Sequence, residues 1–159
     1  MALKTNTLAP DFTLKTKNAE GLHDITLSSF QGKSNVVLLF FPGAFTGPCT
    51  EEMCEVSSGL AEYKDLNAQV FGISCDTAFS QEVFAQQNNI AFPLLSDYAH
   101  KVTELYDVVL EDLAGLGPAS KRAAFVIDKE GKIQYSEETP SPLEFPSFDQ
   151  IIETLKSLD

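Results

Sequence analysis

The chain alternates short apolar runs with polar turns, and the longest of these runs predicts a buried β-strand. Residues 35–41 are mostly valine, leucine and phenylalanine and are apolar on both faces, which is typical of a central strand in a sheet covered on both sides. Pro42 has no amide hydrogen and should end the pairing of this strand. Six other short stretches are predicted as strands: 11–14, 25–27, 69–74, 92–95, 123–128 and 132–136.

Apolar residues at helical spacing predict four helices, which lie between these strands and after the last of them. They cover residues 47–65, 78–87, 99–106 and a C-terminal segment that follows Ser147. The first helix is expected to bend, because Gly59 in its interior weakens it by ~1 kcal/mol. In the last helix, Ser147 and Gln150 form a capping box. The buried face of that helix is predicted to consist of Ile151, Ile152, Leu155 and Leu158.

The order of these elements predicts the fold class. A turn at 128–131 joins the last two strands as an antiparallel hairpin, a polar turn separates the first two, and from residue 35 to residue 128 strands alternate with helices. This alternation implies an α/β fold with a mixed central sheet and helices on both faces. No repeat, linker or low-complexity segment divides the 159 residues, so a single domain is expected over 1–159.

The charge balance makes several classes of partner unfavourable. The chain has 11 Lys and Arg against 23 Asp and Glu, which gives a net charge of −12. We therefore expect it to bind neither nucleic acids nor anionic membranes, since both carry negative charge. The longest apolar run, 36–41, is far shorter than the ~20 residues that span a bilayer, and the first residues lack the apolar stretch of a signal peptide. A cytoplasmic location is expected.

Three cysteines, Cys49, Cys54 and Cys75, are an odd number in a chain without an export signal, which argues against a disulfide framework. Cys49 falls in the first turn of a predicted helix, after a central strand, a proline and a tight loop. Ligands of open α/β sheets bind at this edge, and a helix N-terminus stabilises the nucleophilic thiolate. Cys49 is therefore a candidate nucleophile, and the alternative is a small buried apolar residue.

The residues that precede this cysteine form a motif, Pro42-Gly-Ala-Phe-Thr46-Gly-Pro-Cys49. Its Pro-x-x-x-Thr-x-x-Cys arrangement resembles the active-site motif of the peroxiredoxins. Further segments that resemble this family lie at 9–12, 39–45, 92–97 and 122–128, so the resemblance covers nearly the whole chain. It implies a thioredoxin-like fold and a thiol-dependent peroxidase that reduces hydrogen peroxide and organic hydroperoxides without a metal or prosthetic group.

The resemblance also implies roles for individual residues. Cys49 would be the peroxidatic cysteine, which attacks the peroxide O–O bond and becomes a sulfenic acid. Thr46 would present its hydroxyl to the thiolate and the peroxide, Arg122 would hold a permanent positive charge beside the sulfur, and Pro42 would shield the sulfur from water. Glu52 matches an acidic position that helps to orient the arginine.

Simpler roles are open for three of these residues. Thr46 could serve only as the N-cap of the helix, and Glu52 could only complement the helix dipole. Arg122 could be a surface charge, although it is the sole arginine of the chain and occupies the family position.

Cys54 is the candidate for resolving a sulfenic acid within the chain. On an unbroken helix, five residues separate Cα atoms by roughly 8.6 Å, which exceeds the ~7 Å limit for a disulfide. A Cys49–Cys54 bridge, whose spacing resembles the PrxQ branch, would require the first helical turns to unwind. The surrounding residues resemble the AhpE type, often a one-cysteine enzyme reduced by an external thiol. We expect the one-cysteine mechanism, with the two-cysteine mechanism as the alternative.

Other function classes lack their motifs. A disulfide oxidoreductase normally needs Cys-x-x-Cys, and a metal-binding thioredoxin-like protein would need Cys-x-x-x-Cys and a histidine. His23 and His100 have no metal-ligand spacing with any cysteine, so neither a metal nor another cofactor is expected. Cys75 ends a predicted strand and is expected in the buried core. A redox-sensing module with slow turnover at Cys49 is open as an alternative.

The partners implied by the resemblance are a peroxide substrate and a thiol reductant. The reductant could be thioredoxin, a glutaredoxin-like protein or a small thiol. Relatives commonly pair through surfaces near the active site, so a homodimer is expected by analogy.

Overall fold

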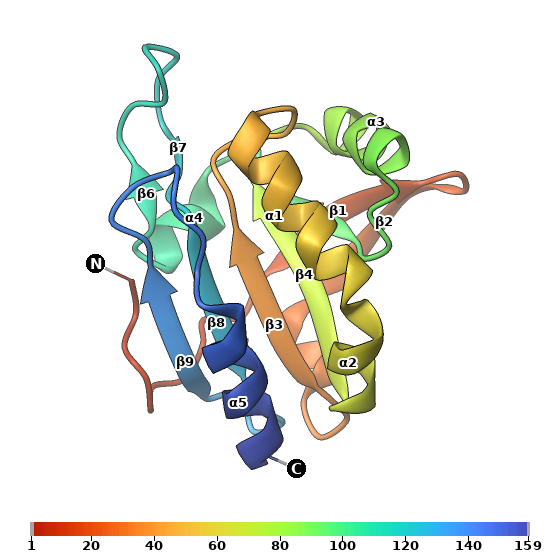
Figure 1. Cartoon of the computed structure of the whole chain (residues 1–159), viewed down its shortest axis with the longest axis vertical. Helices are drawn as coiled ribbons and strands as arrows, with labels where there is room; N and C mark the ends of the chain where they lie inside the picture. Colours follow the sequence, from red (N-terminus) through yellow and green to blue (C-terminus); the bar gives the residue numbers. More distant parts are fainter. Residues whose placement is uncertain (1, 159) are drawn as a thin grey trace.

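A seven-stranded mixed sheet forms the centre of the molecule, and the computed structural model describes residues 2–158 (Figure 1). Its strands are β1 (Thr13–Asn18), β2 (Gly21–Thr26), β3 (Asn35–Phe40), β4 (Ala68–Ser74), β5 (Leu94–Ser96), β8 (Ala123–Ile127) and β9 (Ile133–Glu138). They lie in the order β2-β1-β5-β4-β3-β8-β9. β3 and β5 each pair in parallel with β4, and the other neighbours are antiparallel. The mixed sheet predicted from the sequence is confirmed.

Helices cover both faces of this sheet. They are α1 (Gly47–Ser58), α2 (Leu60–Asp65), α3 (Ala78–Asn88), α4 (Lys101–Leu105), α5 (Phe148–Leu158) and the 3-10 helix η1 (Leu27–Phe30). Every residue of β3 is buried, and its side chains alternate between two cores. Val37 and Leu39 pack with α1, α2, α3 and α5, whereas Leu38 and Phe40 pack with α4 and η1. β3 is therefore the central strand that its two apolar faces predicted.

The predicted bend of the first helix is present at Gly59, which ends α1 and precedes α2. Another glycine, Gly72 of β4, allows α1 to lie close to the sheet. A Cβ atom at Gly72 would lie 3.3 Å from Met53 Sδ of α1 and 2.7 Å from Leu94 Cδ2. The missing side chain therefore leaves room for the helix that carries Cys49.

The element boundaries differ most at one edge of the sheet. The strands predicted at 11–14 and 25–27 are parts of a longer hairpin, in which β1 and β2 pair from Thr13↔Thr26 to Asn18↔Gly21. The side chains of both strands are exposed or only half-buried. Polar residues near the turn can therefore be part of these strands, and the apolar pattern did not reveal them. A separate two-stranded sheet, β6 (Val109–Leu110) with β7 (Ala119–Ser120), was not predicted. Two-residue strands are too short to give a periodic pattern.

The capping box predicted at the start of α5 is only half formed. Ser147 Oγ accepts a hydrogen bond from the Gln150 amide at 3.3 Å, as expected. The Ser147 amide, however, donates to Glu137 Oε1 of β9 at 2.8 Å and not to Gln150. The carboxylate of Glu137 therefore takes the place that the Gln150 side chain has in a complete capping box. Of the predicted buried face, Ile151 and Leu155 are fully buried.

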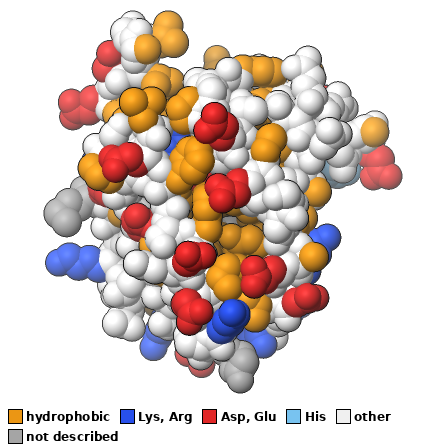
Figure 2. All heavy atoms as spheres, in the orientation of Figure 1, with side chains coloured by type: hydrophobic (Ala, Val, Ile, Leu, Met, Phe, Trp, Pro, Cys, Tyr) orange, Lys and Arg blue, Asp and Glu red, His pale blue; other side chains and the backbone are white. Residues whose placement is uncertain are grey.

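Acidic side chains are spread over the face that carries α1, α2 and α5, where they surround apolar side chains (Figure 2). This distribution agrees with the net charge of −12. Within residues 2–158, no helix has the length and apolar character needed to cross a membrane.

Candidate active site

Cys49 lies in the first turn of α1, at the edge of the sheet where β3 ends. Loop 42–46 connects the two elements, and Thr46 is the N-cap residue of the helix. The first backbone amides of a helix have no intrahelical acceptor and give this end a partial positive charge. Only 1% of Cys49 is exposed, so its sulfur is shielded from bulk water. The cysteine is reduced, as are Cys54 and Cys75.

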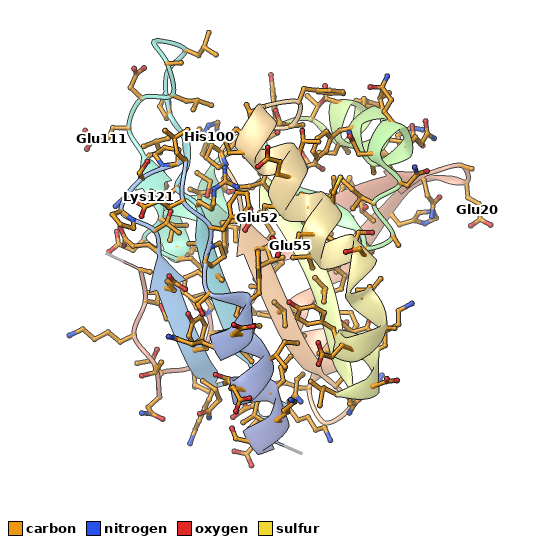
Figure 3. The ribbon with its side chains drawn as sticks, in the orientation of Figure 1. Glu20, Glu52, Glu55, His100, Glu111 and Lys121 are labelled. Carbon is orange, nitrogen blue, oxygen red and sulfur yellow. The ribbon has the colours of Figure 1, made fainter. Side chains whose placement is uncertain are left out.

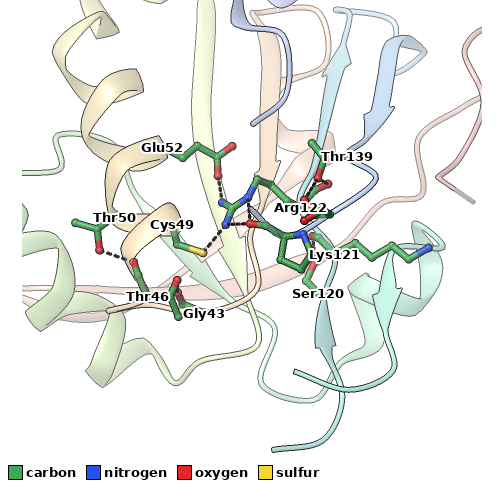
Figure 4. A network of polar contacts seen from close by, with 11 residues as sticks. Gly43, Thr46, Cys49, Thr50, Glu52, Ser120, Lys121, Arg122 and Thr139 are labelled. Atoms are coloured by element: carbon green, nitrogen blue, oxygen red, sulfur yellow. Dashed lines mark hydrogen bonds and ion pairs between the residues drawn. The ribbon is translucent and has the colours of Figure 1, made fainter. Parts of the chain in front are cut away.

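Arg122 directly precedes β8 and contacts the sulfur of Cys49. The antiparallel pairing of Phe40 with Ala123 brings the start of β8 to the end of β3, and this places Arg122 beside the loop that leads to α1. Arg122 Nη2 donates a hydrogen bond to Cys49 Sγ at 3.0 Å (Figure 4). The guanidinium is only 1% exposed, so the interpretation of Arg122 as a surface charge is wrong. A permanent cation is therefore held against the sulfur.

Two residues of the C-terminal connection hold this guanidinium from the other side. The carbonyl oxygen of Pro142 accepts hydrogen bonds from Arg122 Nε at 3.0 Å and from Nη2 at 2.8 Å. The ring of Phe145 lies 5.7 Å from Arg122 Cζ, within the range of a cation–π contact. The guanidinium is thus fixed in orientation before any substrate binds.

Glu52 lies three residues after Cys49 on α1 and is fully buried. Its Oε1 accepts a hydrogen bond from Arg122 Nη1 at 2.5 Å, while Oε2 has no hydrogen-bond partner among the described residues. Burial raises the pKa of Glu52 to about 7, although the Arg122 charge acts in the opposite direction. Glu55, farther along the same helix, raises this pKa further (Figure 3). One buried cation therefore faces two acidic groups, Glu52 and Cys49.

The hydroxyl of Thr46 makes a different contact from the one that the family resemblance implied. Thr46 Oγ1 donates to the carbonyl oxygen of Gly43 at 2.9 Å, within the same loop, and not to the sulfur of Cys49. Thr46 occupies the N-cap position, but its side chain makes no capping hydrogen bond. Pro42 is buried directly after β3, and its shielding of the sulfur stays a prediction. In this reduced state the threonine shapes the loop.

Cys54 lies on the same unbroken helix as Cys49. Its sulfur is directed toward the end of α3, where it donates to the carbonyl oxygen of Asn88 at 3.7 Å. Five helical residues correspond to ~140° of rotation, which turns the two cysteines toward different neighbours. The helix would have to unwind before the two sulfurs could form a bond.

Cys75 directly follows β4 and is half-buried, which is less than the full burial predicted for it. Its sulfur lies 3.5 Å from the hydroxyl oxygen of Thr103. Burial raises the pKa of Cys75 to about 11, and the negative charges of Asp97 and Asp76 add to this effect. The thiol is therefore protonated and unreactive near neutral pH.

Pro142 and Phe145 are the parts of the site that the sequence analysis missed. The proline-rich segment 140–146 has no periodic pattern and gives no sign that it returns to Arg122. Residues 2–158 contain no group of three or more His, Cys, Asp and Glu side chains that could hold a metal ion.

Comparisons with known proteins agree with this geometry. The AhpC/TSA family model matches residues 5–136. Alkyl hydroperoxide reductase E of Mycobacterium tuberculosis is 36% identical over 137 residues, which cover 85% of each chain. Peroxiredoxin Q of Triticum aestivum is 40% identical over 126 residues, which cover 79% of this chain and 55% of that protein.

Solved structures show the same similarity. Peroxidoxin BcpB of Mycobacterium tuberculosis superimposes with a TM-score of 0.84 at 30% identity and covers 99% of both chains. A peroxiredoxin-like protein of Aquifex aeolicus gives a TM-score of 0.87 at 28% identity over 100% of this chain and 90% of that one. The family match, the related sequences and the shared architecture lead to one conclusion: the chain belongs to the AhpC/TSA family and is a peroxiredoxin with a thioredoxin-like fold.

Proposed function

We propose that Cys49 is the peroxidatic cysteine of this thiol-dependent peroxidase and that an external thiol reduces it after each turnover. The observation that carries the proposal is the 3.0 Å hydrogen bond from Arg122 Nη2 to Cys49 Sγ at a helix N-terminus. Both features stabilise the thiolate, which is the form of cysteine that attacks a peroxide.

In the first step, the Cys49 thiolate attacks one peroxide oxygen. A sulfur–oxygen bond forms as the O–O bond breaks, and the sulfur is oxidised by two electrons to a sulfenic acid. The other oxygen leaves with the electron pair of the O–O bond and takes up a proton to become an alcohol or water. Arg122 and the first amides of α1 stabilise the negative charge as it moves from sulfur to oxygen.

In the second step, a reducing thiol attacks the sulfenic sulfur and releases water, which leaves a mixed disulfide on Cys49. A second thiol then breaks this disulfide and restores the thiolate. The position of Cys54 supports an external reductant. Helix α1 is regular, and the Cys54 sulfur contacts α3 on a different side of α1 from Cys49. Thioredoxin, a glutaredoxin-like protein or a small thiol could supply the electrons.

Replacement of Cys54 tests the second step. Cys54→Ser should keep turnover with hydrogen peroxide and a thiol reductant, and Cys75→Ser is the matched control for loss of a half-buried thiol. If Cys54→Ser loses turnover, and the oxidised wild-type protein carries a Cys49–Cys54 disulfide, the two-cysteine mechanism replaces this proposal.

We also propose that the protein forms a homodimer. Large apolar side chains are exposed near the edge of the sheet where the parallel strands end and Cys49 lies. Among them, Phe79 is 60% exposed and Tyr98 is 67% exposed. Pairing of two copies would remove such surface from water. Light scattering should give twice the mass of one chain, and the mass of a single chain at micromolar concentration would contradict the proposal.

A further inference from the structure

Loop 42–46 contains Pro42 and Thr46 and leads into the helix that carries Cys49, and its backbone is unusual. Phe45 has a φ of +67°, which is a rare conformation for a residue with a large side chain. The ring of Phe45 packs edge-on against Phe84 at 5.3 Å, but 53% of the residue is exposed. A conformation of this kind persists only where the surrounding structure holds it.

One hydrogen bond ties this loop to the sheet edge. The amide of Ala44 donates to Oδ2 of Asp76 at 2.8 Å. Asp76 lies two residues beyond β4, which pairs in parallel with β3, so both chain segments leave the sheet at the same edge. Within residues 2–158, this is the one hydrogen bond that joins loop 42–46 to an element other than β3 and α1.

Side chains from three elements hold Asp76 in place. Ser74 Oγ of β4 donates to the same carboxylate oxygen at 2.7 Å, and Gln81 Nε2 of α3 donates to Ser74 Oγ at 2.8 Å. Ser96 Oγ of β5 donates to the Asp76 carbonyl oxygen at 2.6 Å. Ser74 and Gln81 are buried, so water does not compete for the hydrogen bond between them, while Asp76 and Ser96 are half-buried. The carboxylate is therefore a fixed acceptor for the loop.

We propose that Asp76 is a positioning residue for peroxide reduction, because its carboxylate holds the Ala44 amide and thereby fixes Pro42 and Thr46 relative to the Cys49 sulfur. This inference rests on the proposed function of Cys49. Asp76 does not touch the sulfur and acts only through the loop.

The proposal predicts different effects on two reactions of the Cys49 thiolate, oxidation by peroxide and alkylation. Peroxide reduction needs donor groups placed precisely around the reacting oxygen atoms, whereas alkylation by iodoacetamide needs the thiolate and not these donors. Loss of the tether should therefore slow oxidation by peroxide more than alkylation. An asparagine at this position keeps an oxygen that can accept both hydrogen bonds, so it should preserve the tether.

The experiment compares rates of Cys49 oxidation by hydrogen peroxide and of Cys49 alkylation, both measured by quenched-flow mass spectrometry. In Asp76→Ala, oxidation should slow by about tenfold, as expected for one lost charge-assisted hydrogen bond, while alkylation stays near the wild-type rate. Backbone amides of 42–46 should also exchange hydrogen faster. Asp76→Asn should restore the wild-type behaviour.

Asp128→Ala is the matched control. Asp128 is also half-buried and also accepts backbone amides, from Glu130 at 2.9 Å and Lys132 at 3.0 Å. It lies in the turn between β8 and β9, at the opposite end of the sheet. Its loss should leave both rates of Cys49 unchanged. If Asp76→Ala does not fold, Asp76→Ser replaces it, because serine keeps a polar group for Ser74 and ends short of the Ala44 amide.

Three results would overturn the inference. If folded Asp76→Ala, or Asp76→Ser in its place, oxidises at the wild-type rate, the tether does not position the reaction. Equal slowing of oxidation and alkylation indicates a general loss of structure. A wild-type protein in which Cys49 does not react with peroxide refutes the proposed function as well, so the two failures can be distinguished.

Discussion

Cys49 and Cys75 lie near the same edge of the sheet, after the adjacent parallel strands β3 and β4, but their electrostatic surroundings are opposite. Cys49 has the Arg122 guanidinium at 3.0 Å and the N-terminus of α1. Cys75 has the Thr103 hydroxyl at 3.5 Å, and burial together with nearby carboxylates raises its pKa to about 11. Cys49 is the more buried of the two. The comparison shows that exposure does not decide reactivity here, since desolvation of a thiolate can be offset by a fixed cation.

The largest expected effect separates the two cysteines directly. Cys49→Ser should abolish peroxide consumption, because a serine hydroxyl is not ionised at neutral pH and is a poor nucleophile. Cys75→Ser should leave consumption largely intact, because its protonated thiol takes no part. Peroxide loss with a thiol reductant is the measurement. Full activity in Cys49→Ser would refute the assignment of this site.

Removal of the cation should make Cys49 behave more like Cys75. Arg122→Met should slow the reaction with peroxide by roughly 10- to 100-fold, the range expected for one lost hydrogen bond to a charged group. Alkylation of Cys49 should also slow, because the thiolate loses its counter-ion. Lys121→Met is the control, since Lys121 pairs with Glu138 at 2.8 Å and not with Cys49. Wild-type rates of both reactions in Arg122→Met would contradict the role of the arginine.

Replacement of Glu52 tests the second acidic group of the site. The folded state raises the pKa of Glu52 from 4.5 to about 7, so it binds this proton more tightly than the unfolded chain does. Stability contributed by the protonated carboxyl is therefore lost as the pH rises from about 4.5 to about 7. Glu52→Gln should remove this part of the pH dependence.

Thermal unfolding at pH 5 and pH 7.5 measures this effect. The melting temperature of the wild-type protein should fall more between the two values than that of Glu52→Gln. Glu51→Gln provides a control, because Glu51 is exposed on the same helix and does not contribute to the raised pKa of Glu52. An equal fall in the wild type and in Glu52→Gln would show that the buried carboxyl does not take up this proton.

The smallest effect concerns the inert cysteine. At pH 7 to 9, iodoacetamide should label Cys49 rapidly and Cys75 slowly, because a pKa of about 11 leaves little Cys75 thiolate in this range. Peptide mapping after timed labelling gives both rates in one sample. If Cys75 is labelled as fast as Cys49, the two sites do not differ electrostatically in the way that their surroundings predict.

The fold was largely predictable, because its central strands are long and apolar and its helices have regular spacing. The prediction of β3 ended one residue beyond the observed strand, and the bend at Gly59 was also correct. Errors occur where the pattern is weak. The β1–β2 hairpin is covered on one side only, and β6 and β7 have two residues each.

The site was predictable where chemistry follows from a motif, and less so where it depends on tertiary contacts. The position of Cys49 made it a candidate nucleophile, the family resemblance added Arg122 and Glu52, and the structure brings these three together. The hydrogen bond from Thr46 to Gly43 was not predicted, because a motif does not specify the rotation of a hydroxyl. Pro142 acts through its backbone carbonyl, which every residue type has, so its identity gave no signal.

The central claim is that Cys49, and neither of the other cysteines, is the nucleophile that peroxide oxidises. The most direct test is the intact mass of the protein after one equivalent of hydrogen peroxide in the presence of dimedone, followed by peptide mapping. We predict a single dimedone adduct on Cys49, which marks a sulfenic acid that awaits an external thiol. An unchanged mass, or an adduct on Cys54 or Cys75 in place of Cys49, would contradict the account.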